Sequence, residues 1–232
     1  MNRGALWITR TEPGASALAI QLSEQGYNCI TEPLLEIEPI DSKPPATSYD
    51  LVFYLSGHAV QNAQSRPQGN LATFAVGDAT ARRLKEYDLS VEVPLTHSSE
   101  GLLTLSREYR DAKHALIVCG TPTRDFLARG LQDRGLHVDT YKVYQRIVRK
   151  INVGDLYQRS EVILIESLQC LQAIARSLLG TNTTNTVPKA IIVPSERIAD
   201  AARDLNLFRV TRSQGVKLEH MLEALNRVEL CD

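Results

Sequence analysis

The sequence lacks an excess of charge of either sign. Its 26 lysines and arginines stand against 27 aspartates and glutamates, which leaves a formal net charge of -1. Nucleic acids and anionic membrane surfaces attract strongly basic domains, so this composition argues against both as partners. A polyanionic small molecule would have to be bound locally, by helix N-termini and a few arginines.

Clustered cysteines and long hydrophobic runs are missing as well. The four cysteines are far apart and show neither CxxC nor Cys/His ligand spacing: Cys29, Cys119, Cys170 and Cys231. We therefore expect free thiols in a reducing compartment and no metal site. The apolar run near the N-terminus is too short for a signal peptide, and no later run is long enough to cross a bilayer. These features predict a soluble, cytoplasmic protein.

The common nucleotide and hydrolase motifs are missing too. Neither GxGxxG nor GxxxxGK[ST] follows the first apolar run, which argues against a dinucleotide or nucleoside triphosphate enzyme. HExxH and EF-hand spacings do not occur. GxSxG is missing, and the serines at the ends of apolar runs, Ser56, Ser167 and Ser195, have no obvious His and Asp partners.

What the chain does contain is a recurring junction, in which an apolar β-type run stops at Ser, Thr or Gly and an amphipathic helix begins. The junctions are LWITR at 6–10, FYLSGHAV at 53–60, FAVGDATA at 74–81, LIVCGTPTR at 116–124, VILIES at 162–167 and IIVPSERIA at 191–199. Each presents free backbone N–H groups at the positive end of a helix, which suit a carboxylate or phosphate. The sequence therefore predicts a protein that binds an anion.

Strand and helix patterns alternate almost throughout, which predicts an α/β fold with parallel sheets covered on both faces. Strands are expected near 5–9, 28–31, 50–55, 73–76, 91–93, 114–119, 137–140, 161–165, 189–193 and 208–211. Helices are expected near 13–25, 57–65, 78–86, 99–110, 123–134, 167–179, 195–205 and 214–228. Such sheets bind ligands at the carboxyl ends of their strands, where the junctions lie.

Two extended segments, near 32–40 and 138–150, interrupt this alternation. A complete run of alternating units lies between them, which indicates an inserted domain. We expect a discontinuous α/β domain of residues 1–36 plus 148–232, and a second α/β domain of residues 37–147 inserted in it. The two extended segments would pair as a two-stranded linker, with a cleft between the domains.

Several segments resemble, in order and spacing, the uroporphyrinogen-III synthases of gammaproteobacterial type. They are FYLSGHAVQNA, FAVGDATARRL, SSEGLL, LIVCGTPTRDFLARGLQDRGLHVDTYKVYQR and VPSERIADAARDL, and the resemblance runs from Leu6 to about Leu225. It implies a cofactor-free, monomeric, two-domain enzyme that cyclises hydroxymethylbilane, a linear tetrapyrrole polycarboxylate. The product would be uroporphyrinogen III, formed with inversion of ring D and loss of water, and the upstream hydroxymethylbilane synthase is a candidate partner.

The family is held to drive loss of the substrate's hydroxyl, which gives an azafulvene cation. Ring D then attacks through its substituted carbon to form a spiro-pyrrolenine, which fragments and recloses with ring D inverted. The substrate ionises fairly readily and closes without an enzyme to the wrong isomer. The protein must therefore chiefly fold the chain and bias which carbon attacks.

The resemblance also implies roles for individual residues. Tyr144 matches the position proposed to assist departure of the hydroxyl, although a phenol is a poor acid at neutral pH and the help would be partial. Packing on the linker is the structural alternative for Tyr144, and Tyr141 could serve the same role. The expected substrate-binding residues are Ser56, Gly57, His58, Gly77, Thr80, Gly120, Thr121 and Arg124 in the inserted domain, with Thr9, Arg10, Ser167 and Ser195 in the discontinuous one.

Structural roles remain open for several of these residues, such as an N-cap for Ser56 and a solvated helix position for Arg124. Two positions depart from the family: Ser195, where many relatives have threonine, and Glu166, where relatives usually have a hydroxyl or small residue. Two other functions stay open. One is a non-catalytic two-domain protein that binds anions or tetrapyrroles, and the other is a family member acting as an interaction module.

Overall fold

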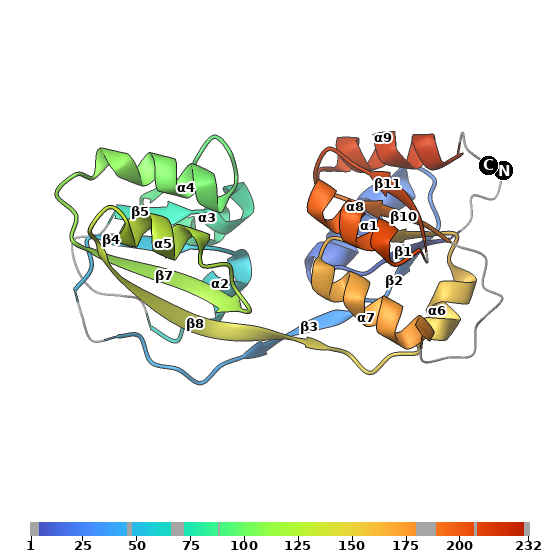
Figure 1. Cartoon of the computed structure of the whole chain (residues 1–232), viewed down its shortest axis with the longest axis horizontal. Coiled ribbons are helices and arrows are strands. Elements are labelled where there is room, and N and C mark those ends of the chain that lie inside the picture. Colours follow the sequence, from blue (N-terminus) through green and yellow to red (C-terminus); the bar gives the residue numbers. More distant parts are fainter. Residues whose placement is uncertain are drawn as a thin grey trace. The chain divides into compact units, whose positions relative to one another are not determined.

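The computed structural model describes residues 5–45, 48–65, 72–87, 89–179, 189–206 and 208–229. The chain divides into two compact units (Figure 1). Unit 1 comprises Met1–Glu36 and Ile147–Asp232, and unit 2 comprises Ile37–Arg146. Cys231 and residues 180–188 lie outside the described residues. Among the helices in the described ranges, none is both long and apolar enough to cross a membrane.

Unit 1 is built on a parallel sheet of five strands in the order β11-β10-β9-β1-β2. The strands are β1 (Leu6–Ile8), β2 (Cys29–Thr31), β9 (Val162–Leu164), β10 (Lys189–Val193) and β11 (Phe208–Arg212). Strand β1 shows why both faces are covered, because successive side chains of a strand point to opposite faces. Leu6 and Ile8 belong to one apolar cluster, and Trp7 belongs to the other.

Helices cover both faces of this sheet (Figure 1). Apolar residues of α1 (Gly14–Glu24) and α9 (Leu218–Glu229) pack with Leu6 and Ile8. Those of α6 (Val153–Arg159), α7 (Leu168–Leu179) and α8 (Glu196–Asp204) pack with Trp7. This arrangement confirms the predicted α/β fold with parallel sheets covered on both faces.

Unit 2 is built on a sheet of six strands in the order β3-β8-β7-β4-β5-β6. The strands are β3 (Leu35–Pro39), β4 (Leu51–Tyr54), β5 (Ala72–Ala75), β6 (Val91–Glu92), β7 (His114–Thr121) and β8 (His137–Val148). The strands from β8 to β6 are parallel. Strand β3 is an edge strand of this sheet and lies next to β8. Directly after β3, Ile40 N donates a hydrogen bond to Val143 O of β8 at 3.0 Å.

Two layers of helices cover this second sheet (Figure 1). Helices α2 (Gly57–Asn62) and α3 (Asp78–Lys85) pack on one face, against Val52 and Tyr54 among others. Helices α4 (Ser99–Leu105) and α5 (Phe126–Gln132) pack on the other face, with Leu51 and Phe53. A short 3-10 turn, η1 (Ser106–Glu108), follows α4.

The sequence pattern missed one helix. The extended segment expected to reach residue 150 ends at Val148, and α6 begins at Val153. The Asn152 side chain starts this helix by accepting a hydrogen bond from Asp155 N at 3.0 Å. Alternating apolar residues before Asn152 imitate a strand there, and α6 has too few turns for its own period to stand out. Its apolar residues Leu156 and Tyr157 are buried in the unit 1 core.

Candidate functional site

Polar side chains in unit 2 gather around the hydroxyl of Tyr144, which lies on β8. Ser56 Oγ is 3.0 Å from this hydroxyl, and Arg146 donates to it from Nη2, also at 3.0 Å. The Arg146 guanidinium carbon lies 5.4 Å from the centre of the phenol ring. Only 1% of Tyr144 is exposed. The hydroxyl is therefore fixed from two sides.

The backbone explains why these groups meet. Tyr144 and Arg146 are two residues apart on one strand, so their side chains leave the same face. The pairing of β7 with β8 shifts register between Cys119 and Gly120, and this shift puts Gly120 opposite Tyr144. A Cβ at Gly120 would overlap the phenol ring. Glycine at position 120 therefore makes room for Tyr144.

Ser56 has two roles at once. It follows β4 and is the N-cap of α2, where its Oγ accepts a hydrogen bond from Ala59 N at 3.0 Å. The same oxygen is a neighbour of the Tyr144 hydroxyl. The capping role considered from the sequence is thus present, and it leaves Ser56 in contact with the predicted catalytic tyrosine. Ser56 is partly exposed, in contrast to Tyr144.

The charge around this group is positive but does not come from histidine. The half-buried His58 ring centre lies 5.7 Å from that of Tyr144. Burial lowers the pKa of His58, and the charges of Arg146 and Arg83 lower it further. His58 is therefore neutral at pH 7, and the arginines provide the positive charge. The Arg83 side chain lies beside Gly57, where a Cβ would be 2.9 Å from Arg83 Nε. Glycine at position 57 therefore makes room for Arg83.

The neighbouring junction of unit 2 holds Gly77 and Thr80. Gly77 is the N-cap of α3, and a Cβ at this position would lie 3.3 Å from the His97 ring. His97 Nε2 is 3.6 Å from Asp78 Oδ2 at the start of the same helix. The Thr80 side chain is buried in the first turn of α3. Because Gly77 has no side chain, the His97 ring lies close to its backbone. The buried Thr80, in contrast, presents little surface to a ligand.

Thr121 is the last residue of β7, and Arg124 lies three residues beyond it. Thr121 pairs with Gln145 of β8, one residue beyond the pair of Gly120 and Tyr144. Arg124 lines an open groove of about 610 Å³ at the start of α5, together with Thr123, Phe126 and Arg129. Arg124, a predicted substrate-binding residue, therefore has a second arginine, Arg129, beside the same groove.

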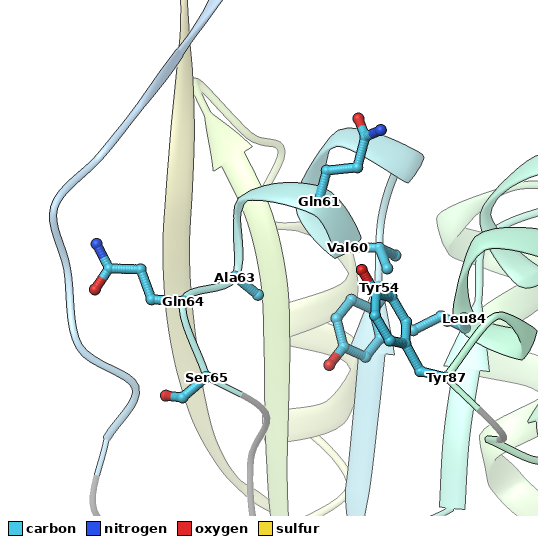
Figure 2. Close-up of a pocket in the computed structure, with 8 residues that line it drawn as sticks. All are labelled: Tyr54, Val60, Gln61, Ala63, Gln64, Ser65, Leu84 and Tyr87. Atoms are coloured by element: carbon cyan, nitrogen blue, oxygen red, sulfur yellow. The ribbon is translucent and has the colours of Figure 1, made fainter.

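A second cavity of unit 2, of about 240 Å³, lies against α2 and α3. Figure 2 shows the rings of Tyr54 and Tyr87 next to Val60 and Leu84, with Gln64 and Ser65 on the segment that leaves α2. Ser56, His58 and Tyr144 are not among its lining residues. This cavity is therefore separate from the group around Tyr144.

In unit 1, the structure gives Thr9 and Arg10 protein partners. Thr9 is fully buried, and its hydroxyl donates to Leu164 O at 2.7 Å, so its side chain is part of the sheet and not of a ligand surface. Arg10 Nε lies 3.3 Å from Glu166 Oε2 across neighbouring strands. The Arg10 guanidinium also covers Gly14, where a Cβ would lie 2.8 Å from Nε.

Glu166, which departs from the family, is enclosed beside Arg10. Its side chain is 15% exposed, and its Oε1 is buried without a hydrogen-bond partner among the described residues. Burial raises the pKa of this carboxyl, and the charge of Arg10 offsets only part of the rise. The acidic group thus points into the unit and is partly neutralised by Arg10.

The two remaining serines of unit 1 are at helix starts. Ser167 Oγ accepts a hydrogen bond from Cys170 N at 3.1 Å in the first turn of α7. Ser195 is the N-cap of α8, but its hydroxyl makes no capping hydrogen bond, and its carbonyl accepts from Ile198 N and Ala199 N. Ser195 therefore has a hydroxyl that the helix does not use.

Sequence reasoning missed Arg146 and Arg83. The signal for Arg146 was present in VYQR, because the alternation of a strand places Tyr144 and Arg146 on one face. Arg83 carried no such signal, since its contact with Gly57 joins two helices, α2 and α3. The sequence pattern does not show which face of α3 meets α2.

Comparisons with known proteins agree on one family. A family model described as uroporphyrinogen-III synthase HemD matches residues 16–223. The chain is 28% identical over 244 residues to the uroporphyrinogen-III synthase of Salmonella typhimurium, covering 95% of this chain and 99% of that one. It is 30% identical over 161 residues to the Proteus mirabilis enzyme of the same name, covering 62% of this chain and 80% of that one.

A solved structure shares the fold. The uroporphyrinogen-III synthetase of Helicobacter pylori 26695 superposes with a TM-score of 0.63 at 14% sequence identity, covering 97% of this chain and 99% of that one.

Proposed function

The chain belongs to the uroporphyrinogen-III synthase family, enzymes of tetrapyrrole biosynthesis, and from that premise we propose which of its residues convert hydroxymethylbilane to uroporphyrinogen III. The observation that carries the proposal is the hydroxyl group of Tyr144, held 3.0 Å from both Ser56 Oγ and Arg146 Nη2. A hydroxyl donor fixed in this way suits the first chemical step, in which the substrate's own hydroxyl must leave.

Departure of that hydroxyl is easier when a proton or a hydrogen-bond donor reaches its oxygen. The paired hydroxyls of Tyr144 and Ser56 provide such a donor. Arg146 can stabilise the negative charge that remains on the phenol oxygen as its proton moves away, because a charged donor is already in place. These three residues therefore supply both a donor and a stabilising charge for the first step.

The substrate's carboxylates need separate contacts. In unit 2, Arg83 supplies positive charge beside His58. We also include the backbone at Gly57 and Gly77, which lie next to the side chains of Arg83 and His97. Further proposed contacts in unit 2 are Gly120, Thr121 and Arg124. In unit 1, we include Arg10, Ser167 and Ser195, and leave out the buried hydroxyl of Thr9.

The instability of the substrate also bears on partners. Free hydroxymethylbilane closes to the wrong isomer, so direct transfer from hydroxymethylbilane synthase would protect it. We include this transfer in the proposal, with a monomeric cytoplasmic enzyme as its simplest form. Sedimentation of the chain alone tests whether it is a monomer, and a stable dimer would contradict this. Sedimentation with the upstream enzyme tests direct transfer, and the lack of any complex would contradict it.

A coupled assay tests the reaction itself. Hydroxymethylbilane is generated with its synthase, the chain is added, and the oxidised porphyrin isomers are separated. We expect mainly isomer III, whereas formation of isomer I alone would refute the proposal. A protein that only binds tetrapyrroles would also give isomer I alone, while still binding the substrate.

A pair of tyrosine variants tests the residue assignment. Tyr144→Phe should lower kcat by about tenfold or more, because it removes the hydroxyl from the group. The matched control is Tyr141→Phe, since Tyr141 is equally buried on the same strand and its hydroxyl donates to Ser42 O at 3.0 Å. Equal activities of the two variants would contradict a role for the Tyr144 hydroxyl.

A further inference from the structure

We infer that Ser56, and not Tyr144, makes the direct contact with the departing hydroxyl, and that Tyr144 passes its own proton to Ser56 while Arg146 holds the phenol oxygen. This inference rests on the proposed function. It assigns the contact with the substrate to one of the two hydroxyls, and it makes Tyr144 and Arg146 positioning residues behind it.

Ser56 is more accessible to a substrate than Tyr144. Tyr144 is 1% exposed and belongs to the apolar cluster that α2 and α3 form with the sheet of unit 2. Ser56 is partly exposed at the start of α2. A substrate that comes to the carboxyl ends of these strands therefore meets Ser56 before it meets the phenol oxygen.

The hydrogen-bond donors and acceptors around the two hydroxyls also favour Ser56 as the group that meets the substrate. A guanidinium only donates, so the phenol oxygen accepts from Arg146. Ser56 Oγ already accepts from Ala59 N. When Tyr144 donates to Ser56 Oγ, both lone pairs of the serine oxygen are used and its own proton is free to point outward. The direction from Arg146 through Tyr144 to Ser56 thus leaves a donor on the exposed member of the pair.

The proton balance of the first step follows from this direction. The Ser56 proton moves to the substrate's hydroxyl oxygen, the C–O bond breaks with its electron pair on that oxygen, and water leaves. The Tyr144 proton moves to Ser56 Oγ, which leaves one negative charge on the phenol oxygen beside Arg146. When ring D closes and its pyrrole is restored, the released proton returns to Tyr144 through Ser56, and the site is reset.

Ser56→Gly tests the contact between Ser56 and the departing hydroxyl with little damage to the fold. Glycine is an acceptable N-cap, so Ser56→Gly should cost little helix stability. We expect kcat for isomer III to fall about as much as in Tyr144→Phe, roughly 10- to 100-fold. KM should change less than threefold, and Ser56→Thr should restore most of kcat.

A matched capping control separates chemistry from helix capping. Asn152 caps α6 with a hydrogen bond from Asp155 N at 3.0 Å, the same distance as in the Ser56 cap. Asn152→Gly should therefore cost similar stability and leave kcat within twofold of the parent chain. Thermal unfolding of all variants checks that each one folds.

Double variants decide between the relay and direct contact by Tyr144. If the proton passes along one chain, Ser56→Gly combined with Tyr144→Phe should be no slower than the slower single variant. Arg146→Met should lower kcat on its own and have no further effect beside Tyr144→Phe. Ser56→Gly within twofold of the parent, or single effects that multiply, would overturn the relay. Isomer I alone from the parent chain would instead overturn the proposed function.

Discussion

Replacing Gly120 by alanine should displace the Tyr144 ring while the hydroxyls of Tyr144 and Ser56 both stay in the chain. The three atoms nearest to an added Cβ all belong to the Tyr144 ring, and Cε1 would lie at 2.7 Å. Carbon atoms in contact are normally about 3.5–4.0 Å apart, so the ring must move by roughly 1 Å. Hydrogen bonds of 3.0 Å from the phenol oxygen would then lengthen beyond bonding distance.

The expected losses differ for stability and for activity. Overpacking of this kind costs about 1–3 kcal/mol of the free energy of unfolding. A displacement of about 1 Å at a reacting group can cost about 100-fold in rate. We therefore expect Gly120→Ala to fold, with a lowered denaturant midpoint, and to form isomer III about 100-fold more slowly in the coupled assay.

Two further variants test whether overlap with the Tyr144 ring causes these losses. Gly154→Ala is the control, since the nearest atom to its added Cβ among the described residues would be Asn152 Oδ1, at 3.6 Å. It should keep full activity and gain some stability, because alanine favours a helix. In a Tyr144→Ala background the ring is gone, so the stability cost of Gly120→Ala should largely disappear. An equal cost in both backgrounds would show that overlap with the ring is not its cause.

Three further predictions concern charge. Glu166→Gln should raise stability at pH 7. The pKa of this buried carboxyl is raised in the folded state, so the parent chain loses stability as the pH rises from the unfolded-state pKa to the folded-state pKa. The gain from Glu166→Gln should vanish in acid, where the parent carboxyl is also neutral. Arg10→Met should cost about 2 kcal/mol by leaving Glu166 without its cation, and adding Glu166→Gln should recover most of this cost. Asp50→Asn should show the opposite pH dependence, since hydrogen bonds from Lys113 N and His114 N lower the pKa of Asp50 and its stabilisation is lost as pH falls through the folded value. The expected cost at pH 7 is about 1 kcal/mol. Urea unfolding of each variant from pH 3 to 8 checks all three, and curves parallel to the parent's would contradict the assigned carboxyls.

The sequence was sufficient for features that repeat locally. The alternation of Leu6, Trp7 and Ile8 places one strand between two helix layers, and the structure confirms this from both apolar clusters. The junction at Ser56 was also visible, because a hydroxyl directly after an apolar run is a typical N-cap. Both signals depend on neighbours within a few residues.

Features that depend on strand order and register could not be read in this way. Arg10 and Glu166 meet because β1 and β9 are neighbours, although 155 positions separate the hydrogen-bonded Thr9 and Leu164. The register shift after Cys119, which puts Gly120 opposite Tyr144, has no local signature. Alternation alone shows that a strand exists, but not which strand lies beside it.

The chemistry of the substrate explains why position should matter more than acid strength in this chain. Hydroxymethylbilane ionises and closes without help, so a modest donor is enough for the first step, while the choice of attacking carbon depends on how the chain is held. Tyr144→Phe removes a donor but leaves the ring and its surroundings in place. Gly120→Ala moves the ring and with it the contact to Ser56. The displacement should therefore impair formation of isomer III more than removal of the hydroxyl does.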